Sequence, residues 1–142
     1  MSRYKAKTWW GLVLAGCILG VIWIITRTPA PVLTKILATY PVGSQGMLYA
    51  VLSDSGGATV PMTYRYYVHR RMDNPSEALE SLRNEGAAFL VTRDASARVE
   101  VQGNVVKIAV KKAVFSFNTP TLFQHQDGYT TVDVWLQAQP DE

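Results

Sequence analysis

Cysteine and histidine are scarce in this 142-residue chain, which holds one cysteine and two histidines. Cys17 has no second cysteine to pair with, so no disulfide can form within the chain. His69 and His125 are far apart in the sequence, and no group of residues has the spacing typical of a zinc site. We therefore expect a fold stabilised by burial alone, with no metal and no cofactor.

Positive charge is also scarce outside the N-terminus. Four of the 14 lysine and arginine residues lie at or before residue 27, so the ten that follow face all 11 acidic residues. A nucleic-acid-binding protein normally carries a basic surface interleaved with aromatic residues, and residues 28–142 contain no such stripe. We expect no nucleic-acid partner.

The N-terminus instead contains a long uncharged run, residues 8–26 (TWWGLVLAGCILGVIWIIT). A helix of this length spans about 28 Å, close to the hydrocarbon thickness of a bilayer. Trp9, Trp10 and Trp23 lie toward its two ends, where indoles favour the headgroup boundary, and three basic residues precede it. Residues 1–27 are predicted to form a cytoplasmic tip and a single transmembrane anchor in a bacterial inner membrane, with the rest of the chain in the periplasm.

Two alternatives concern the fate of this segment. Residues 14–17 (LAGC) resemble a bacterial lipobox, in which Cys17 would be lipidated and the leader removed, and cleavage to a free protein is the other alternative. The apolar stretch before Cys17 is short and the run continues after it, which favours the uncleaved anchor. All three outcomes place the following domain in the same compartment.

The rest of the chain is predicted to be an α+β domain, mostly an antiparallel β meander with one inserted helix. Residues 28–45 form an expected linker, whose apolar positions 32, 33, 36 and 37 are spaced as in a short amphipathic helix. Residues 46–138 form the expected β-rich domain, and residues 139–142 a frayed tail. Strands are expected at residues 47–52, 58–69, 88–92, 98–102, 105–111, 113–117 and 130–136.

The inserted helix is expected at residues 75–85. Asn74 is a good N-cap, Pro75 suits the first helical position, and Gly86 suits the C-terminal end. Alternation in the strands predicts which side chains point inward. The inward side chains are expected to include Tyr64, Tyr66 and Val68, then Ala113, Phe115 and Phe117, then Val132, Val134 and Leu136.

Residues 53–57 (SDSGG) resemble the nucleophile region of chymotrypsin-like proteases. Such a serine needs a histidine and an aspartate earlier in the chain, whereas both histidines come later. We interpret the segment as a structural turn, in which Asp54 bonds the local backbone and Gly56 and Gly57 supply unusual torsion angles.

Arg65, Tyr67, His69 and Trp135 are the candidate partner-binding residues, because their expected positions are on outward faces and such residue types dominate binding hot spots. In the alternative interpretation the tyrosines only pack across the sheet and the charges are solvated. A periplasmic binding protein, of an immunity or envelope-complex accessory type, is the leading hypothesis. An envelope-acting hydrolase is the other, and it requires His69 or His125 within hydrogen-bond reach of a carboxylate or of Ser55.

The acidic turn at residues 54–59 and the aromatic strand at residues 62–68 resemble those of a group of small proteobacterial envelope proteins. The resemblance continues at residues 105–110, 113–118 and 132–136, and it spans roughly residues 48–137. Many of those proteins carry cysteine where Gly56 stands here, so no role of that thiol can be transferred. The resemblance implies a small β-rich domain tethered to the membrane outside the cytoplasm, and it implies no reaction.

Overall fold

The computed structural model describes residues 16–17, 31–54, 56 and 61–139. The chain divides into two compact units, Met1–Ala30 and Pro31–Glu142. The predicted anchor, with Trp9, Trp10 and Trp23, lies outside the described residues except for Gly16 and Cys17. Within the described part, no helix has the length and apolar character needed to cross a membrane.

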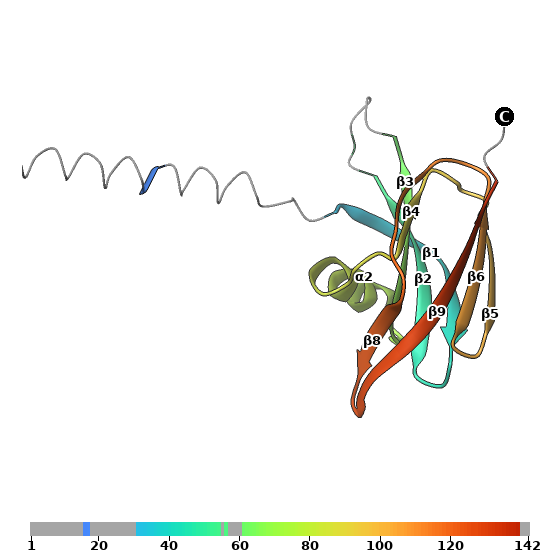
Figure 1. Ribbon diagram of the computed structural model, residues 1–142. Helices are drawn as coiled ribbons and strands as arrows, with labels where there is room; N and C mark the ends of the chain where they lie inside the picture. Colours follow the sequence, from blue (N-terminus) through green and yellow to red (C-terminus); the bar gives the residue numbers. More distant parts are fainter. Residues whose placement is uncertain (1–15, 18–30, 55, 57–60, 140–142) are drawn as a thin grey trace, which may run out of the picture. The chain divides into compact units, whose positions relative to one another are not determined.

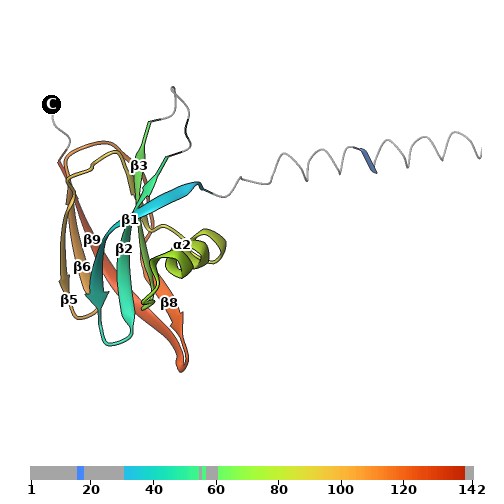
Figure 2. The same ribbon diagram turned by 180° about the vertical axis from the view of Figure 1, so that it is seen from behind.

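The second unit contains two β-sheets and one helix among its described residues (Figures 1 and 2). The first sheet has the strand order β1-β2-β3-β4-β7, and the second sheet has the order β5-β6-β9-β8. The elements are β1 (Leu33–Val42), β2 (Gly46–Ser53), β3 (Thr63–Arg70), α2 (Pro75–Asn84), β4 (Leu90–Thr92), β5 (Arg98–Gln102), β6 (Val105–Val110), β7 (Val114–Phe117), β8 (Thr121–His125) and β9 (Gly128–Ala138).

For the described residues of the second unit, the α+β class with mostly antiparallel strands and one inserted helix is confirmed. The simple meander is wrong, because the chain leaves the first sheet for β5 and β6, returns for β7, and leaves again for β8 and β9. It also brings β6 and β9 together in parallel. Periodicity along a sequence identifies strands but carries no information on which strands pair.

The main core lies between the two sheets. The first sheet contributes side chains such as Leu48, Tyr66 and Val68, and the second contributes Ile108 and Val132, all of which are buried in one cluster. Because the chain has no disulfide, burial of these apolar side chains is the principal contribution to its stability.

The helix α2 covers the other face of the first sheet. Ala78 and Leu82 of the helix pack in a second buried cluster with Tyr49 and Tyr67 of the sheet. The helix begins as predicted, with the Asn74 side chain accepting a hydrogen bond from the Ser76 N–H at 2.9 Å. The hydroxyl of Tyr49 accepts from the Met72 N–H and donates to the Arg70 carbonyl, so that the chain leading into α2 is held against the sheet.

The amphipathic helix predicted in residues 28–45 is wrong, because this segment forms the edge strand β1. Register irregularities between Leu33 and Lys35 and between Ile36 and Ala38 interrupt the alternation of the strand. Leu33 and Ile36 therefore both pack in the cluster beneath α2, although they are three residues apart. The irregularity between Leu33 and Lys35 thus gives Leu33 and Ile36 an apolar spacing that is typical of a helix.

The inward orientation predicted for Phe115 is also wrong, since this side chain is 54% exposed. Val114 and Phe117 pack against the core instead. The pairing of β4 with β7 is irregular between Val91 and Thr92, and such an irregularity changes which residues of the strand face inward.

A buried carboxylate joins the two sheets at one end. Asp94, which follows β4, is only 1% exposed. Its Oδ2 accepts a hydrogen bond of 2.6 Å from the N–H of Lys111, which follows β6, and its Oδ1 accepts from the N–H and hydroxyl of Ser96, each at 2.9 Å. Burial alone would raise the pKa of Asp94, but these donors together hold the pKa below its usual value.

We predict that Asp94→Asn destabilises the domain at pH 7 by about 1–3 kcal/mol, because an amide has one acceptor oxygen and its NH2 would face either the Lys111 N–H or the Ser96 N–H, leaving a buried donor unpaired. The pKa of Asp94 is lowered on folding, so the carboxylate adds to the free energy of unfolding above about pH 3.8. This contribution is lost as the pH falls through the lower pKa of the folded state. Urea denaturation at pH 7 and below pH 3 should show the difference between the two proteins shrinking in acid. The exposed Asp133→Asn is the control, and a constant difference at both pH values would contradict the prediction.

Candidate functional site

The four predicted partner-binding residues do not lie on one surface. Arg65, Tyr67 and His69 alternate along β3 on the face of the first sheet that carries α2, whereas Trp135 lies on β9 in the second sheet and is 66% exposed. The structure therefore does not bring Trp135 together with the other three residues.

Tyr67 is 1% exposed and packs with Ala78 and Leu82 beneath the helix. Burial raises its pKa, and the nearby charge of Arg65 partly opposes this shift. The outward orientation predicted for Tyr67 is therefore wrong. The strand β3 lies inside its sheet with a buried layer on each face, so side chains of both parities are covered.

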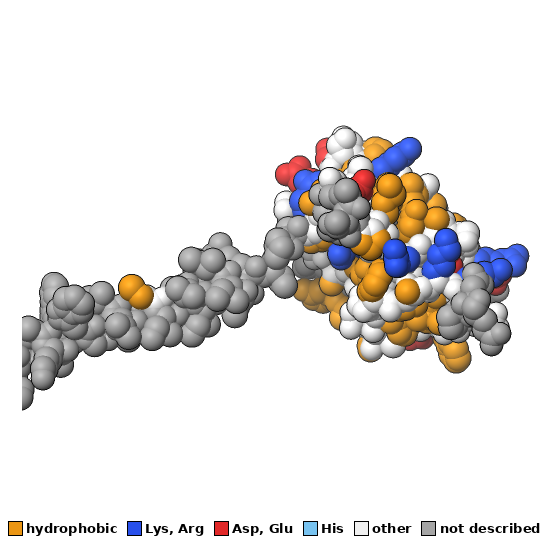
Figure 3. Space-filling model, turned by 90° about the horizontal axis from the view of Figure 1, so that it is seen from above, with side chains coloured by type: hydrophobic (Ala, Val, Ile, Leu, Met, Phe, Trp, Pro, Cys, Tyr) orange, Lys and Arg blue, Asp and Glu red, His pale blue; other side chains and the backbone are white. Residues whose placement is uncertain are grey.

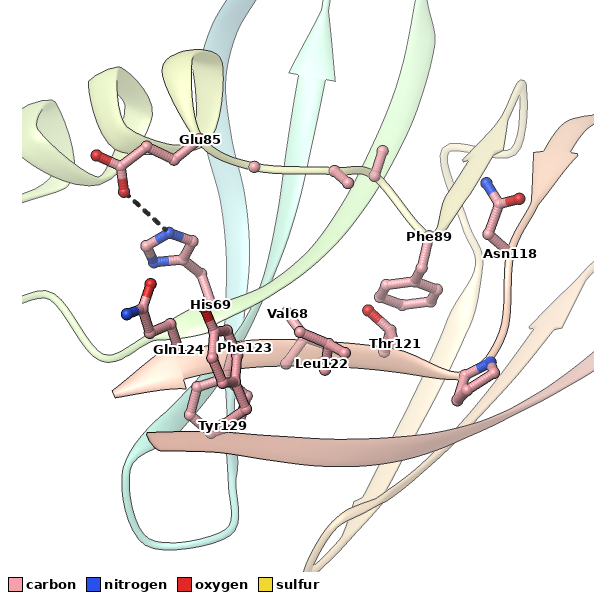
Figure 4. A pocket seen from close by; sticks show the side chains of 14 residues that line it. Val68, His69, Glu85, Phe89, Asn118, Thr121, Leu122, Phe123, Gln124 and Tyr129 are labelled. Atoms are coloured by element: carbon pink, nitrogen blue, oxygen red, sulfur yellow. Dashed lines mark ion pairs between the residues drawn. The ribbon is translucent and has the colours of Figure 1, made fainter. Parts of the chain in front are cut away.

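A hollow of about 440 Å³ opens beside β8, between the second half of β3, the connection from α2 to β4, and the start of β9. We call it the β8 groove. Figure 4 shows His69 and Glu85 at one end and Phe89, Asn118 and Thr121 at the other, with Leu122, Phe123 and Tyr129 along one side. Leu122 and Tyr129 are 56% and 68% exposed, so the groove has an apolar wall open to solvent.

Among the predicted site residues that the structure describes, His69 alone lines this groove. Its Nε2 lies 3.9 Å from the Glu85 carboxylate and 3.5 Å from the Ser81 hydroxyl, and its Nδ1 is buried without a hydrogen-bond partner among the described residues. Burial lowers the pKa of His69, the charge of Arg70 lowers it further, and Glu85 acts in the opposite direction. The net effect favours the neutral form of the imidazole.

This arrangement meets the requirement of the hydrolase hypothesis only in part. A histidine lies near a carboxylate, but at an ion-pair distance and not within a hydrogen bond. In a nucleophile–base–acid relay the serine and the acid contact different ring nitrogens, whereas Ser81 and Glu85 both approach Nε2. His125 contacts the Thr130 hydroxyl at 3.0 Å and the Asp127 backbone N–H.

The predicted turn at residues 53–57 is described at Asp54 and Gly56. The Asp54 carboxylate accepts a 2.8 Å hydrogen bond from the Gly56 N–H, and Gly56 has a φ of 71°, which a residue with a side chain rarely adopts. Ser55 and Gly57 lie outside the described residues.

Two further hollows on the surface are lined by both charged and apolar side chains. Trp135 lines a hollow of about 410 Å³ on the outer face of the second sheet with Arg98, Glu100 and Lys107. The end of the domain around Asp94 is basic and apolar, and Figure 3, which looks onto this end, shows Lys and Arg side chains among hydrophobic ones. The residues that line an open hollow of about 740 Å³ at that end include Pro61, Met62, Arg93, Lys111 and Lys112.

In the described part of the chain, no three His, Cys, Asp or Glu side chains lie close enough together to hold a metal ion.

The groove contains residues that the sequence analysis did not identify, namely Glu85, Phe89, Leu122 and Tyr129. The strand β8 itself was missed. Asp127-Gly128, shortly after Leu122 and Phe123, is a turn signal that predicts a strand ending just before it, and in the structure Gln126 and Asp127 form the turn between β8 and β9.

Comparison of the chain with protein-family models, with curated proteins and with solved structures finds no match. The resemblance to proteobacterial envelope proteins remains a prediction.

We predict that the domain loses stability between pH 7.5 and 5 through His69. A histidine whose pKa is lowered on folding makes its full contribution to the free energy of unfolding above its unfolded pKa of about 6.5. It loses that contribution as the pH falls through its pKa in the folded state. Denaturation curves of the wild type and His69→Gln at both pH values test this. The variant should show the smaller loss of unfolding free energy in acid, and equal losses in the two proteins would refute the assignment to His69.

Proposed function

We propose that this chain is a single-pass protein of a bacterial inner membrane, whose β domain binds a partner protein in the periplasm. The anchor is supported by the uncharged residues 8–26, their terminal tryptophans and the basic residues that precede them. The second compact unit begins at Pro31, and four residues separate it from the end of this run.

The β8 groove is the observation that carries the binding role. It combines an apolar wall with a few polar groups, and ligand-binding hollows in proteins have this composition. The exposed Leu122 and Tyr129 beside it would be covered by a bound partner. An immunity-type protein that neutralises a toxin, or an accessory subunit of an envelope complex, would use such a surface.

We predict that the full chain stays in the membrane fraction after extraction with alkaline carbonate, and that a reporter fused after Glu142 is active outside the cytoplasm. Cys17→Ser should behave in the same way, because a helical anchor does not depend on the thiol. Loss of membrane retention in this variant alone would indicate the lipoprotein alternative. Release of the unaltered chain by carbonate would contradict the anchor.

We predict that a photocrosslinking residue at position 122 captures a defined protein in native membranes. The matched control is position 39 in the edge strand β1, which is also exposed but does not line the groove. Detection uses mass spectrometry of the adduct. Adducts of equal yield at both positions, or none at either, would count against a binding role for the groove.

A further inference from the structure

The strand β8 lies at the edge of the second sheet, and its pairing there is with β9 alone. His125 and Gly128 close a two-residue hairpin, and such a closing pair exchanges hydrogen bonds across the ladder. Hydrogen-bonded pairs alternate from there, so Phe123 and Thr121 also bond to β9. The N–H and C=O groups of Leu122 and Gln124 point away from β9, and both residues line the β8 groove.

The sequence of β8 leaves this edge open to another strand. Soluble proteins usually protect an edge with charges, proline or bulges. The edge strand β1 contains Lys35, Pro41 and two register irregularities, and the edge strand β5 contains Arg98 and Glu100. The residues of β8 (TLFQH) include no lysine, arginine, acid or proline.

The groove beside this edge has both apolar and charged features. Phe89, Pro120 and Leu122 supply apolar surface to a side chain that enters the hollow. Glu85, whose side chain is 62% exposed, supplies a negative charge at one end, and the neutral His69 beside it does not cancel that charge. A segment that carries a lysine or arginine is electrostatically complementary to this end.

We propose that an extended segment of the partner protein adds to the free edge of β8 as a further strand, with an apolar side chain in the groove and a basic side chain against Glu85. Backbone hydrogen bonds to Leu122 and Gln124 would supply affinity, and the groove would supply specificity. The proposal rests on the proposed binding role and specifies how the binding occurs.

The test uses the full chain in detergent and three synthetic octapeptides labelled with fluorescein. The first alternates valine and lysine, the second has glutamate in place of lysine, and the third is the first peptide with alternate backbone amides methylated. The first peptide should bind. The other two should bind at least about tenfold more weakly, because each loses a charge-complementary contact or its backbone hydrogen bonds.

Two substitutions at one position separate the backbone from the side chain. Gln124→Pro removes an N–H that β9 does not use, so the fold should persist, and a melting curve checks this. It should weaken binding of the first peptide by about tenfold, whereas Gln124→Ala, which keeps the N–H, should change binding by less than about threefold. Glu85→Gln should reduce the preference for the lysine peptide over the glutamate peptide.

Each contrary outcome overturns strand addition. Equal affinity for the methylated and unmethylated peptides, or equal effects of Gln124→Pro and Gln124→Ala, would show that backbone pairing does not carry binding. A wild-type dimer that Gln124→Pro dissociates would show that the edge joins two copies of this chain. If position 122 still captures a protein in membranes while these peptide results fail, the binding role stands and only the mode of binding is wrong.

Discussion

Stability in this domain depends on burial of both faces of the first sheet. Strands β2 and β3 turn Leu48, Tyr66 and Val68 toward the second sheet, and they turn Tyr49 and Tyr67 toward α2. With no disulfide available, the two apolar layers must supply the stabilisation that the chain requires. Two of the polar groups that this packing encloses, the Tyr49 hydroxyl and the Asp94 carboxylate, form hydrogen bonds that hold neighbouring segments together.

The candidate site follows from unequal strand lengths in the same sheet. The strand β3 has eight residues, but the three-residue β4 pairs only with Tyr64, Arg65 and Tyr66. Beyond that point, the connection from α2 and the strand β8 of the second sheet both lie near β3 and line the same hollow. The groove therefore lies where neither sheet continues, and both His69 and the free edge of β8 border it.

Local patterns predicted much of the fold. The N-cap at Asn74 and the proline after it located the helix to within one residue, and the inward side chains of β9 were identified correctly. The errors occurred where a bulge shifted the alternation, as in β1 and β7, and where both faces of a strand are buried, as at Tyr67. The site was largely missed because Glu85, Phe89 and Leu122 meet only through the packing of distant segments. His69 was identified because its residue type alone marks it as a candidate functional residue, whatever its neighbours are.

The position of β9 has a consequence for how the chain is made. This strand is synthesised last of the described elements, yet it is inserted between β6 and β8. Until Ala138 has left the ribosome, the second sheet lacks an interior strand, and the apolar face of the first sheet has an incomplete cover. Folding must therefore be completed after elongation, and the nascent polypeptide would need protection from aggregation and proteolysis during that interval.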